Sequence, residues 1–297
     1  MSRFNTFRIS IEAYYLAHQR DLPWRKEVPV PYEVWLSEII LQQTRVAQGT
    51  PYFHKILAAF PTIEALANAE EDKLLALWTG LGYYNRARNL QKGARQIVAE
   101  YQGQLPERYD ELLNIKGIGP YTAAAIASIC FQEKIGVVDG NVYRVLSRYF
   151  GINTPTNSTL GQREFQTLAN ECIQGTKHPG MYNQGIMEFG ALHCTPKNPN
   201  CMYCPLNNSC YAFNSGAVSE LPVKLKKGKR TKETLHFGIV QNKNKVALRK
   251  RGTDSIWAGL YEFPQLDGIP KNGQLLAEPM LHQLSHKDPY RPFWAAT

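Results

Sequence analysis

The stretch Leu112–Val142, LLNIKGIGPYTAAAIASICFQEKIGVVDGNV, decides how this chain folds. It reads as a helix ending near Ile115, a tight KGIG turn, and a second helix that begins at Pro120. Proline suits a first helical position because its missing N–H would have no partner there. Gly117 and Gly119 let the chain reverse and leave backbone N–H groups at a helix start. The stretch therefore predicts two helices joined by a hairpin that can hold a phosphate.

A single acid follows this hairpin. Asp139 stands in VVDGNV, between an apolar run and a glycine. An aspartate there is also a sound N-cap for a helix running to about Tyr149, and the turn alone is compatible with an αα-hairpin that binds no ligand. A phosphate-binding turn followed by a lone carboxylate nevertheless favours chemistry on a nucleic-acid strand.

Composition bounds the partners and the compartment. The 297 residues are enough for two domains, and the net charge of +9 favours a polyanionic partner, although charge alone does not exclude a basic protein of another kind. The segment MSRFNTFRIS lacks the apolar core of a signal peptide, and no run reaches membrane-spanning length. We therefore expect no membrane partner and a cytoplasmic protein, nucleoid-associated if bacterial. In such a compartment six cysteines predict metal ligands or buried thiols rather than disulfides.

One long helix is predicted for PYEVWLSEIILQQTRVAQG, beginning at Pro31 or Tyr32 and ending at Gly49. Within it Glu38 lies between apolar neighbours. A partly buried carboxyl has a raised pKa and can carry a proton near neutral pH. The plainer alternative is a surface glutamate on an amphipathic helix.

Helical patterns continue along the chain, and strand patterns begin only near residue 234, so the first 215 residues are predicted to be all-α. The further helices are expected at 5–19, 50–60, 62–69, 70–79, 84–101 and, as a pair, within 160–192. The GLGYY loop at 80–84 could insert a side chain between bases, or could be a tight turn packed by its two tyrosines.

Four cysteines crowd into the segment 194–210, spaced C-x6-C-x2-C-x5-C. With three prolines in and around them, this loop cannot build its own core, so we expect a metal centre. Zinc usually takes two close C-x-x-C pairs, whereas only Cys201 and Cys204 form such a pair here. A four-thiolate [4Fe–4S] cluster fits the uneven spacing better.

A basic segment, 216–233, follows the cysteines and is predicted to be a linker; near DNA its lysines and arginine would add salt-sensitive affinity. Beyond it come the strand patterns LHFGIVQ and KVALRKR, separated by an Asn-Lys-Asn turn.

Together the motifs SEIILQQT, KGIGPY and VVDGNV and the cysteine loop resemble MutY-type adenine DNA glycosylases of the endonuclease III, or helix-hairpin-helix, superfamily. The resemblance runs from about Trp24 to Cys210 and more weakly to Trp294. It implies a mainly α fold: a two-lobed all-helical glycosylase with an iron–sulfur cluster loop, and a small α+β Nudix-like C-terminal domain that ends early. The glutamate-rich box of Nudix hydrolases is absent, which argues against pyrophosphatase activity.

The resemblance also implies domain limits. These are a helical region at 1–215, with a six-helix lobe at about 31–135 that includes the hairpin 107–130, a second lobe from 1–30 and 136–215, the linker 216–233, and a partial lesion-recognition domain at 234–297.

Site residues follow from the same motifs. The resemblance implies that Glu38 is the general acid and that Asp139 stabilises the cationic sugar. Tyr121 occupies the position where the endonuclease III branch has a lysine, and Asn141 supports the active-site water network. The cluster ligands would be Cys194, Cys201, Cys204 and Cys210.

Further residues are implied to contact DNA. Those lining the pocket for the extruded adenine are Trp24, Arg25, Leu41 and Gln184. Those binding the duplex or wedging into it are Gln43, Thr44, Tyr83, Gly117 and Gly119. Those reading 8-oxoguanine are Ser285 and His286, preceded by Leu284 where an aromatic residue is more usual.

The expected activity is hydrolysis of the N-glycosidic bond of adenine opposite 8-oxoguanine or guanine in double-stranded DNA, by a monofunctional monomer. A thymine or oxidised-pyrimidine glycosylase is the first alternative, although Tyr121 offers no amine for the Schiff base of a lyase. A non-enzymatic iron–sulfur DNA-binding protein is the second, and it would need neither Glu38 nor Asp139.

Overall fold

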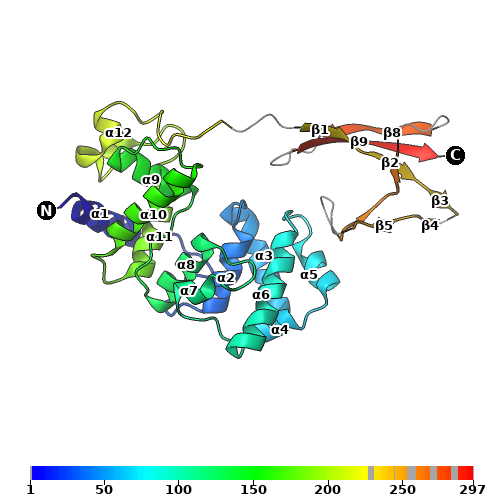
Figure 1. Cartoon of the computed structure of the whole chain (residues 1–297), viewed down its shortest axis with the longest axis horizontal. Helices are drawn as coiled ribbons and strands as arrows, with labels where there is room; N and C mark the ends of the chain where they lie inside the picture. The colour runs from blue at the N-terminus through cyan, green and yellow to red at the C-terminus, as the bar shows by residue number, and fades with distance from the viewer. Residues whose placement is uncertain are drawn as a thin grey trace. The chain divides into compact units, whose positions relative to one another are not determined.

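The computed structural model describes residues 2–226, 231–243, 245–252, 259–267, 273–281 and 287–296. The chain divides into two units, Met1–Leu225 and Lys226–Thr297. The described part of the first unit is helical, and that of the second consists of strands (Figure 1). No helix among the described residues is long and apolar enough to cross a membrane.

The first unit bears out the prediction that the region before residue 215 is all-α over its described residues. Its α-helices are α1 (Arg3–His18), α2 (Pro31–Ile40), α3 (Val46–Ala59), α4 (Ile63–Ala67), α5 (Glu71–Trp78), α6 (Asn85–Tyr101), α7 (Tyr109–Leu112), α8 (Pro120–Phe131), α9 (Gly140–Phe150), α10 (Thr159–Ile173), α11 (Pro179–Leu192) and α12 (Tyr211–Asn214). Two short 3-10 turns, η1 (Cys201–Tyr203) and η2 (Asn207–Ser209), lie in the cysteine loop.

Helices α8 and α11 connect the two groups of helices in this unit. Helix α11 packs on α1 and α9, helix α8 packs on α2 and α7, and α8 and α11 pack on each other. In Figure 1 the helices α1 and α9–α12 accordingly form one group and α2–α7 another. Helices α8 and α11 therefore bring Glu38 of α2 close to Asp139 at the start of α9.

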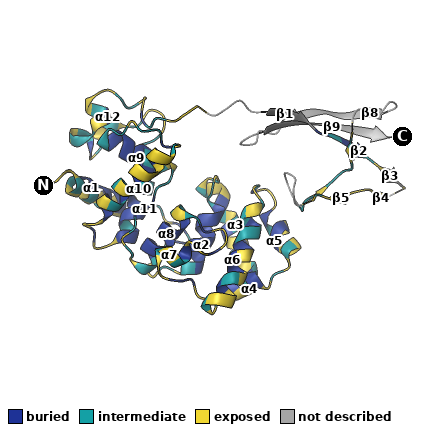
Figure 2. Cartoon of the chain, viewed as in Figure 1, coloured by how far each residue is buried: buried dark blue, intermediate teal, exposed yellow. Residues whose placement is uncertain are grey.

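Helix α8 is buried almost all round. Every residue from Thr122 to Ile129 is buried, and buried residues gather where the helices of this unit face one another (Figure 2). A helix enclosed on all sides has no polar face, and alanines allow its neighbours to approach closely. One close approach is at Gly180 of α11, where a Cβ atom would lie 2.6 Å from the Cα atom of Ile129.

The hairpin that precedes α8 is held by buried side chains, while its turn is exposed to solvent. Ile115 and Ile118 are buried, whereas Lys116 and Gly117 are exposed. Gly117 has a φ of +87°, and a Cβ atom there would lie 2.8 Å from the Cβ atom of Asn89. Only glycine meets both demands easily. The first helix of the hairpin is short and ends at Leu112 rather than near Ile115.

The prediction of one helix from Pro31 to Gly49 is wrong. Helix α2 ends at Ile40, residues 41–45 form a turn, and α3 begins at Val46. Gly49 lies inside α3, where its missing Cβ makes room for Leu41; a Cβ would stand 2.8 Å from the Cδ2 atom of that leucine. The break after Ile40 depends on Arg86, because its guanidinium donates hydrogen bonds to the last carbonyl oxygens of α2. Because Arg86 is distant in sequence, local periodicity could not reveal the break.

The linker prediction at 216–233 is also wrong in its first part. Leu221 is 3% exposed, and its carbonyl oxygen accepts from Arg148 Nε at 3.1 Å. The carbonyl oxygen of Val223 accepts from the backbone N–H of Thr156 at 3.0 Å. Residues up to 225 therefore belong to the helical unit.

The second unit contains a sheet in the order β1-β9-β2-β7, with β8 also paired to β9. Strand β9 runs parallel to β1 and β2 and antiparallel to β8, and Phe237 of β2 lies opposite Phe293 of β9. Two small hairpins, β3–β4 and β5–β6, complete its described strands. The strands are β1 (Thr231–Thr234), β2 (His236–Ile239), β3 (Gln241–Asn242), β4 (Lys245–Val246), β5 (Arg249–Lys250), β6 (Tyr261–Glu262), β7 (Gln265–Leu266), β8 (Gly273–Leu281) and β9 (Lys287–Ala296).

One buried side chain fixes the segment that leads to Asp139. Asn183 of α11 is 0% exposed. Its Nδ2 donates to Ser128 Oγ and to the carbonyl oxygen of Ile135, both at 2.8 Å. Its Oδ1 accepts from the backbone N–H of Val137 at 3.2 Å. Asn183 therefore joins α8, α11 and the chain just before the candidate catalytic acid.

We predict that Asn183→Ala lowers the free energy of unfolding by about 2–4 kcal/mol, because several buried polar groups lose their partner at once. Chemical denaturation followed by circular dichroism measures this change. The matched control is Asn85→Ala on the exposed start of α6, which should change the same free energy by less than about 0.5 kcal/mol. Equal stabilities of the two variants would contradict the role given to Asn183.

Candidate active site and cysteine cluster

Two carboxyl groups from different helices face one site. Glu38 belongs to α2 and is 9% exposed, while Asp139 is the N-cap of α9. The two groups interact electrostatically, since the negative charge of Asp139 disfavours the ionised form of Glu38. Asp139 thus is the helix cap that its sequence context suggested, and at the same time a member of a carboxyl pair.

The surroundings of the two carboxyls differ. Asp139 Oδ1 accepts from the backbone N–H groups of Asn141 and Val142 at 2.9 and 2.8 Å, and Oδ2 accepts from Asn141 Nδ2 at 2.8 Å. Burial raises the pKa of Asp139 above its ordinary value, and these donors offset only part of that rise. The pKa of Glu38 is raised to about 7, with burial as the largest cause. A hydrogen bond with Tyr121 and the charge of Arg25 offset part of this rise, and the nearby Asp139 adds to it. Glu38 therefore retains its proton to near neutral pH, while the N–H donors around Asp139 favour the ionised form of that carboxyl.

Tyr121 stands between Glu38 and a sulfur atom. It lies in the first turn of α8, and its hydroxyl donates to Met187 Sδ at 3.2 Å and also hydrogen-bonds Glu38. Burial, followed by the two nearby carboxyls, raises the pKa of Tyr121 well above its ordinary value. The phenol is therefore neutral. It can donate to Glu38 when that residue is ionised, and accept from it when it is protonated.

Arg144 links the acid pair to the cysteine loop, and the sequence reasoning missed it. Its Nη2 donates to Asn141 Oδ1 at 2.9 Å and to the carbonyl oxygen of Gly190 at 2.6 Å. Its Nε donates to the carbonyl oxygen of Cys194 at 2.7 Å. The available signal was its position three residues after Asn141, on the same face of α9.

A cavity of about 190 Å³ brings together three of the four residues predicted for the adenine pocket, Trp24, Arg25 and Gln184. Tyr15 also lines it, and its hydroxyl donates to Gln184 Oε1 at 3.1 Å. Leu41, the fourth predicted residue, is not part of this lining; it lies in the turn after α2 and contacts α3.

Glu188 holds one wall of this cavity in place, and no sequence signal indicated it. Its side chain is 1% exposed and pairs with Arg20 at 2.7 Å and with Arg25 at 2.9 Å. Burial alone would raise the pKa of Glu188, but hydrogen bonds from Arg20 and Arg25 lower it to about 2. The Arg25 guanidinium also lies over the ring of Tyr15, 5.4 Å from its centre. The loop carrying Trp24 and Arg25 is therefore fixed to α11.

The residues predicted to wedge into DNA lie on two short loops. Gln43 and Tyr83 are both exposed, and both have left-handed backbone conformations, with φ of 56° and 50°. Thr44 is half-buried beside them, its Oγ1 at 3.5 Å from both terminal nitrogens of Arg86.

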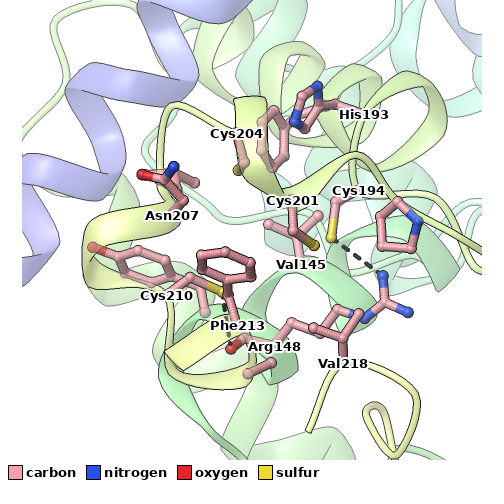
Figure 3. A pocket seen from close by; sticks show the side chains of 15 residues that line it. Val145, Arg148, His193, Cys194, Cys201, Cys204, Asn207, Cys210, Phe213 and Val218 are labelled. Carbon is pink, nitrogen blue, oxygen red and sulfur yellow. Dashed lines mark hydrogen bonds between the residues drawn. The ribbon is translucent and has the colours of Figure 1, made fainter. Parts of the chain in front are cut away.

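The four cysteines of the loop surround one small cavity of about 30 Å³, and all four are free thiols (Figure 3). Arg148 contributes two contacts, Nη1 at 3.5 Å from Cys194 Sγ and its carbonyl oxygen at 3.6 Å from Cys210 Sγ. The rest of the wall is mainly apolar, formed by Val145, Phe189, Leu206, Phe213 and Val218. Among the described residues, no three His, Cys, Asp or Glu side chains converge as the ligands of a single metal ion do.

The remaining predicted site residues cannot be placed. Ser285 and His286, and Leu284 before them, lie outside the described residues.

Comparisons with known proteins identify the family to which this fold belongs. The family of HhH-GPD superfamily base excision DNA repair proteins matches residues 36–170. An adenine DNA glycosylase of Buchnera aphidicola subsp. Schizaphis graminum (strain Sg) is 38% identical over 86% of this chain and 73% of that protein. The adenine DNA glycosylase of Homo sapiens is 41% identical over 71% of this chain and 40% of that protein. The solved structure of a thermostable thymine-DNA glycosylase is similar with a TM-score of 0.66 at 28% identity, over 72% of this chain and 97% of that one.

The matched family range contains both Glu38 and Asp139 and the hairpin between them. The mainly helical helix-hairpin-helix fold expected from the motifs is thereby confirmed. The chain is a DNA glycosylase that belongs to the adenine DNA glycosylase family, within the HhH-GPD superfamily of base excision DNA repair proteins.

Proposed function

We propose that the protein hydrolyses the N-glycosidic bond of adenine paired with 8-oxoguanine or guanine in duplex DNA, with Glu38 as general acid and Asp139 as the stabiliser of the sugar cation. The observation that carries this proposal is the carboxyl pair with divided roles. Glu38 has a pKa of about 7, while Asp139 is surrounded by N–H donors that favour its ionised form.

Adenine is a poor leaving group, so a proton delivered to the purine ring makes the bond easier to break. Glu38 carries that proton at neutral pH because burial disfavours its charge. As the bond breaks, the sugar becomes an oxocarbenium-like cation, and the fixed negative charge of Asp139 stabilises it. Asn141 and Arg144 hold the Asp139 carboxylate in one orientation.

The base must leave the duplex to reach these groups. The cavity lined by Trp24, Arg25 and Gln184 offers an aromatic surface and hydrogen-bonding groups for an extruded purine. Gln43 and Tyr83 would fill the space that the base leaves, and the exposed turn with Gly117 and Gly119 would hold a phosphate. Tyr121 provides no amine, so the enzyme would be monofunctional.

The cysteine loop would bind a [4Fe–4S] cluster through Cys194, Cys201, Cys204 and Cys210. Each iron of such a cluster takes one cysteine, so the four sulfur atoms stand apart around a shared centre instead of meeting at one ion. Four free thiols around one mainly apolar cavity, without a group that converges on a single ion, suit that arrangement. The cluster would hold a loop that has little core of its own.

The C-terminal unit would read the base opposite the adenine through Ser285 and His286. A hydroxyl and an imidazole can hydrogen-bond the N–H at position seven and the carbonyl at position eight that distinguish 8-oxoguanine from guanine.

A panel of duplexes tests the proposed substrate. We predict adenine release from A opposite 8-oxoguanine and A opposite G, and none from T opposite G or from thymine glycol, assayed by alkaline strand cleavage. A chain ending at Leu225, the boundary of the helical unit, should still release adenine. It should lose most of its preference for 8-oxoguanine, because each unmatched polar group costs about 1–3 kcal/mol.

Two outcomes of the panel would be decisive. Thymine release from T opposite G would replace adenine by thymine as the substrate. Equal discrimination by the full and shortened chains would assign lesion reading to the helical unit.

The pH dependence tests the two carboxyls. Because the proton on Glu38 is the active form and its pKa is about 7, we predict that the single-turnover rate falls as pH rises through that value. Tyr121→Phe removes a hydrogen bond that lowers this pKa, so the alkaline limb should move to higher pH. Glu38→Gln and Asp139→Asn should abolish release while mispaired DNA is still bound.

The control for this shift is Tyr143→Phe on α9, whose ring packs against Phe165 instead; it should leave the limb in place. An alkaline limb that is unchanged or moves to lower pH in Tyr121→Phe would contradict the proposed hydrogen bond.

The metal content tests the cysteine loop. Protein purified without air should be brown and contain about four irons per chain. Cys204→Ser should lower the iron content and the yield of folded protein, whereas Cys172→Ser, a buried thiol in α10 away from the loop, should leave the iron content unchanged. Stoichiometric zinc without iron would refute the assignment.

A further inference from the structure

Two loops of the helical unit each hold one residue in an unusual backbone conformation at an exposed position. The first is the turn 41–45 with Gln43 at φ 56°, and the second is the loop 79–84 with Tyr83 at φ 50°. Residues other than glycine rarely adopt the left-handed backbone conformation, and they keep it only where the surrounding structure enforces it. Tyr83 is 54% exposed, so packing of its own ring does not supply that enforcement.

Arg86, in the first turn of α6, contacts both loops with one guanidinium group. Its Nη1 donates to the carbonyl oxygens of Ile39, Ile40 and Gln42 at 2.9, 2.8 and 2.6 Å. Its Nη2 donates to those of Leu81 and Gly82 at 3.4 and 3.3 Å. The first three carbonyls end α2 and begin the turn of Gln43, and the last two directly precede Tyr83.

Aromatic contacts add to this arrangement. The Arg86 guanidinium lies 5.4 Å from the ring centre of Trp78 and 5.8 Å from that of Tyr83. Trp78 is 0% exposed, and its Nε1 donates to the same Gly82 carbonyl at 3.1 Å. The planar fork of arginine can bond several acceptors and stack on rings at once, which a lysine ammonium cannot do.

We infer that Arg86 is a positioning residue that locks the two loops into one rigid wedge, so that Gln43 and Tyr83 enter the duplex together. This inference rests on the proposed function, because it concerns the step in which adenine leaves the stack. The loops of a preformed wedge are already ordered before the base is extruded. Extrusion therefore does not have to include the free-energy cost of ordering them.

The packing around Arg86 allows this role to be separated from folding. Ile39, Ile40, Ala87 and Leu90 are buried in the core that joins α2 and α6. Arg86→Lys removes the fork and keeps the charge and the core. Arg88→Lys is the matched control, since Arg88 lies on the same helix but pairs with Glu71 at 3.0 Å.

The experiment measures extrusion and chemistry separately. A duplex carrying 2-aminopurine beside an A opposite 8-oxoguanine mispair reports extrusion by stopped-flow fluorescence, and single-turnover cleavage reports release. Arg86→Lys should slow extrusion about tenfold or more, whereas Arg88→Lys should not. The alkaline limb of the pH profile should be the same in both variants, because the Glu38 site is untouched.

A double-mutant cycle tests the coupling itself. In the parent protein, the losses caused by Gln43→Ala and Tyr83→Ala should be non-additive by at least about threefold. In the Arg86→Lys background the two losses should become additive.

Each outcome is informative. Unchanged extrusion in Arg86→Lys, or coupling that persists in its background, overturns the inference. If Arg86→Lys does not fold, the cycle in the parent background still decides, because additive losses there overturn it. A parent protein that releases no adenine from any duplex refutes the proposed function instead, and the two failures are thus distinguishable.

Discussion

The burial of two carboxyl groups beside each other is the constraint on which this structure depends. Burial disfavours the charge of each group, and the charge of Asp139 further disfavours that of Glu38. The carboxylate of Asp139 accepts hydrogen bonds from three N–H groups. Arg144 in turn donates to Asn141, which supplies two of these groups. Glu38, by contrast, has a neutral hydrogen-bond partner, Tyr121, and is also influenced by the charge of Arg25. The different surroundings separate the two pKa values, as the proposed roles of acid and anion require.

Helix α8 makes this pair geometrically possible. Its small residues let α2 and α11 approach from different sides, so a glutamate from one group of helices reaches an aspartate at the edge of the other. The same helix begins at the exposed glycine turn and carries Tyr121 in its first turn. A phosphate held at the turn would therefore be fixed relative to the carboxyl pair through one rigid element. The second connection is α11, where Glu188 fixes Arg25 and Asn183 fixes the segment before Asp139.

Sequence could predict the residues whose signal is local. Glu38, Asp139, Tyr121 and the four cysteines each stand in a short motif, and the hairpin follows from its glycines and proline. It could not predict features made by distant partners. The end of α2 depends on Arg86, the wall of the cavity on Glu188, and the docking of residues 217–225 on Arg148 and Thr156. The partners in these contacts are many residues apart in the chain, and hydrophobic periodicity contains no signal for such pairs.

The pKa of Glu38 has a further consequence when a base enters the site. In the free protein 9% of Glu38 is still exposed, and the water that reaches it favours the ionised form. Under the proposed function, a flat purine bound against Glu38 would remove this water, so the pKa would rise and the proton would stay on Glu38 until a ring nitrogen of the base accepted it. Asp139 is less affected, because its N–H donors belong to the protein and remain when water leaves. The arrival of the base would therefore widen the difference between the pKa values of the two carboxyls at the moment when the glycosidic bond has to break.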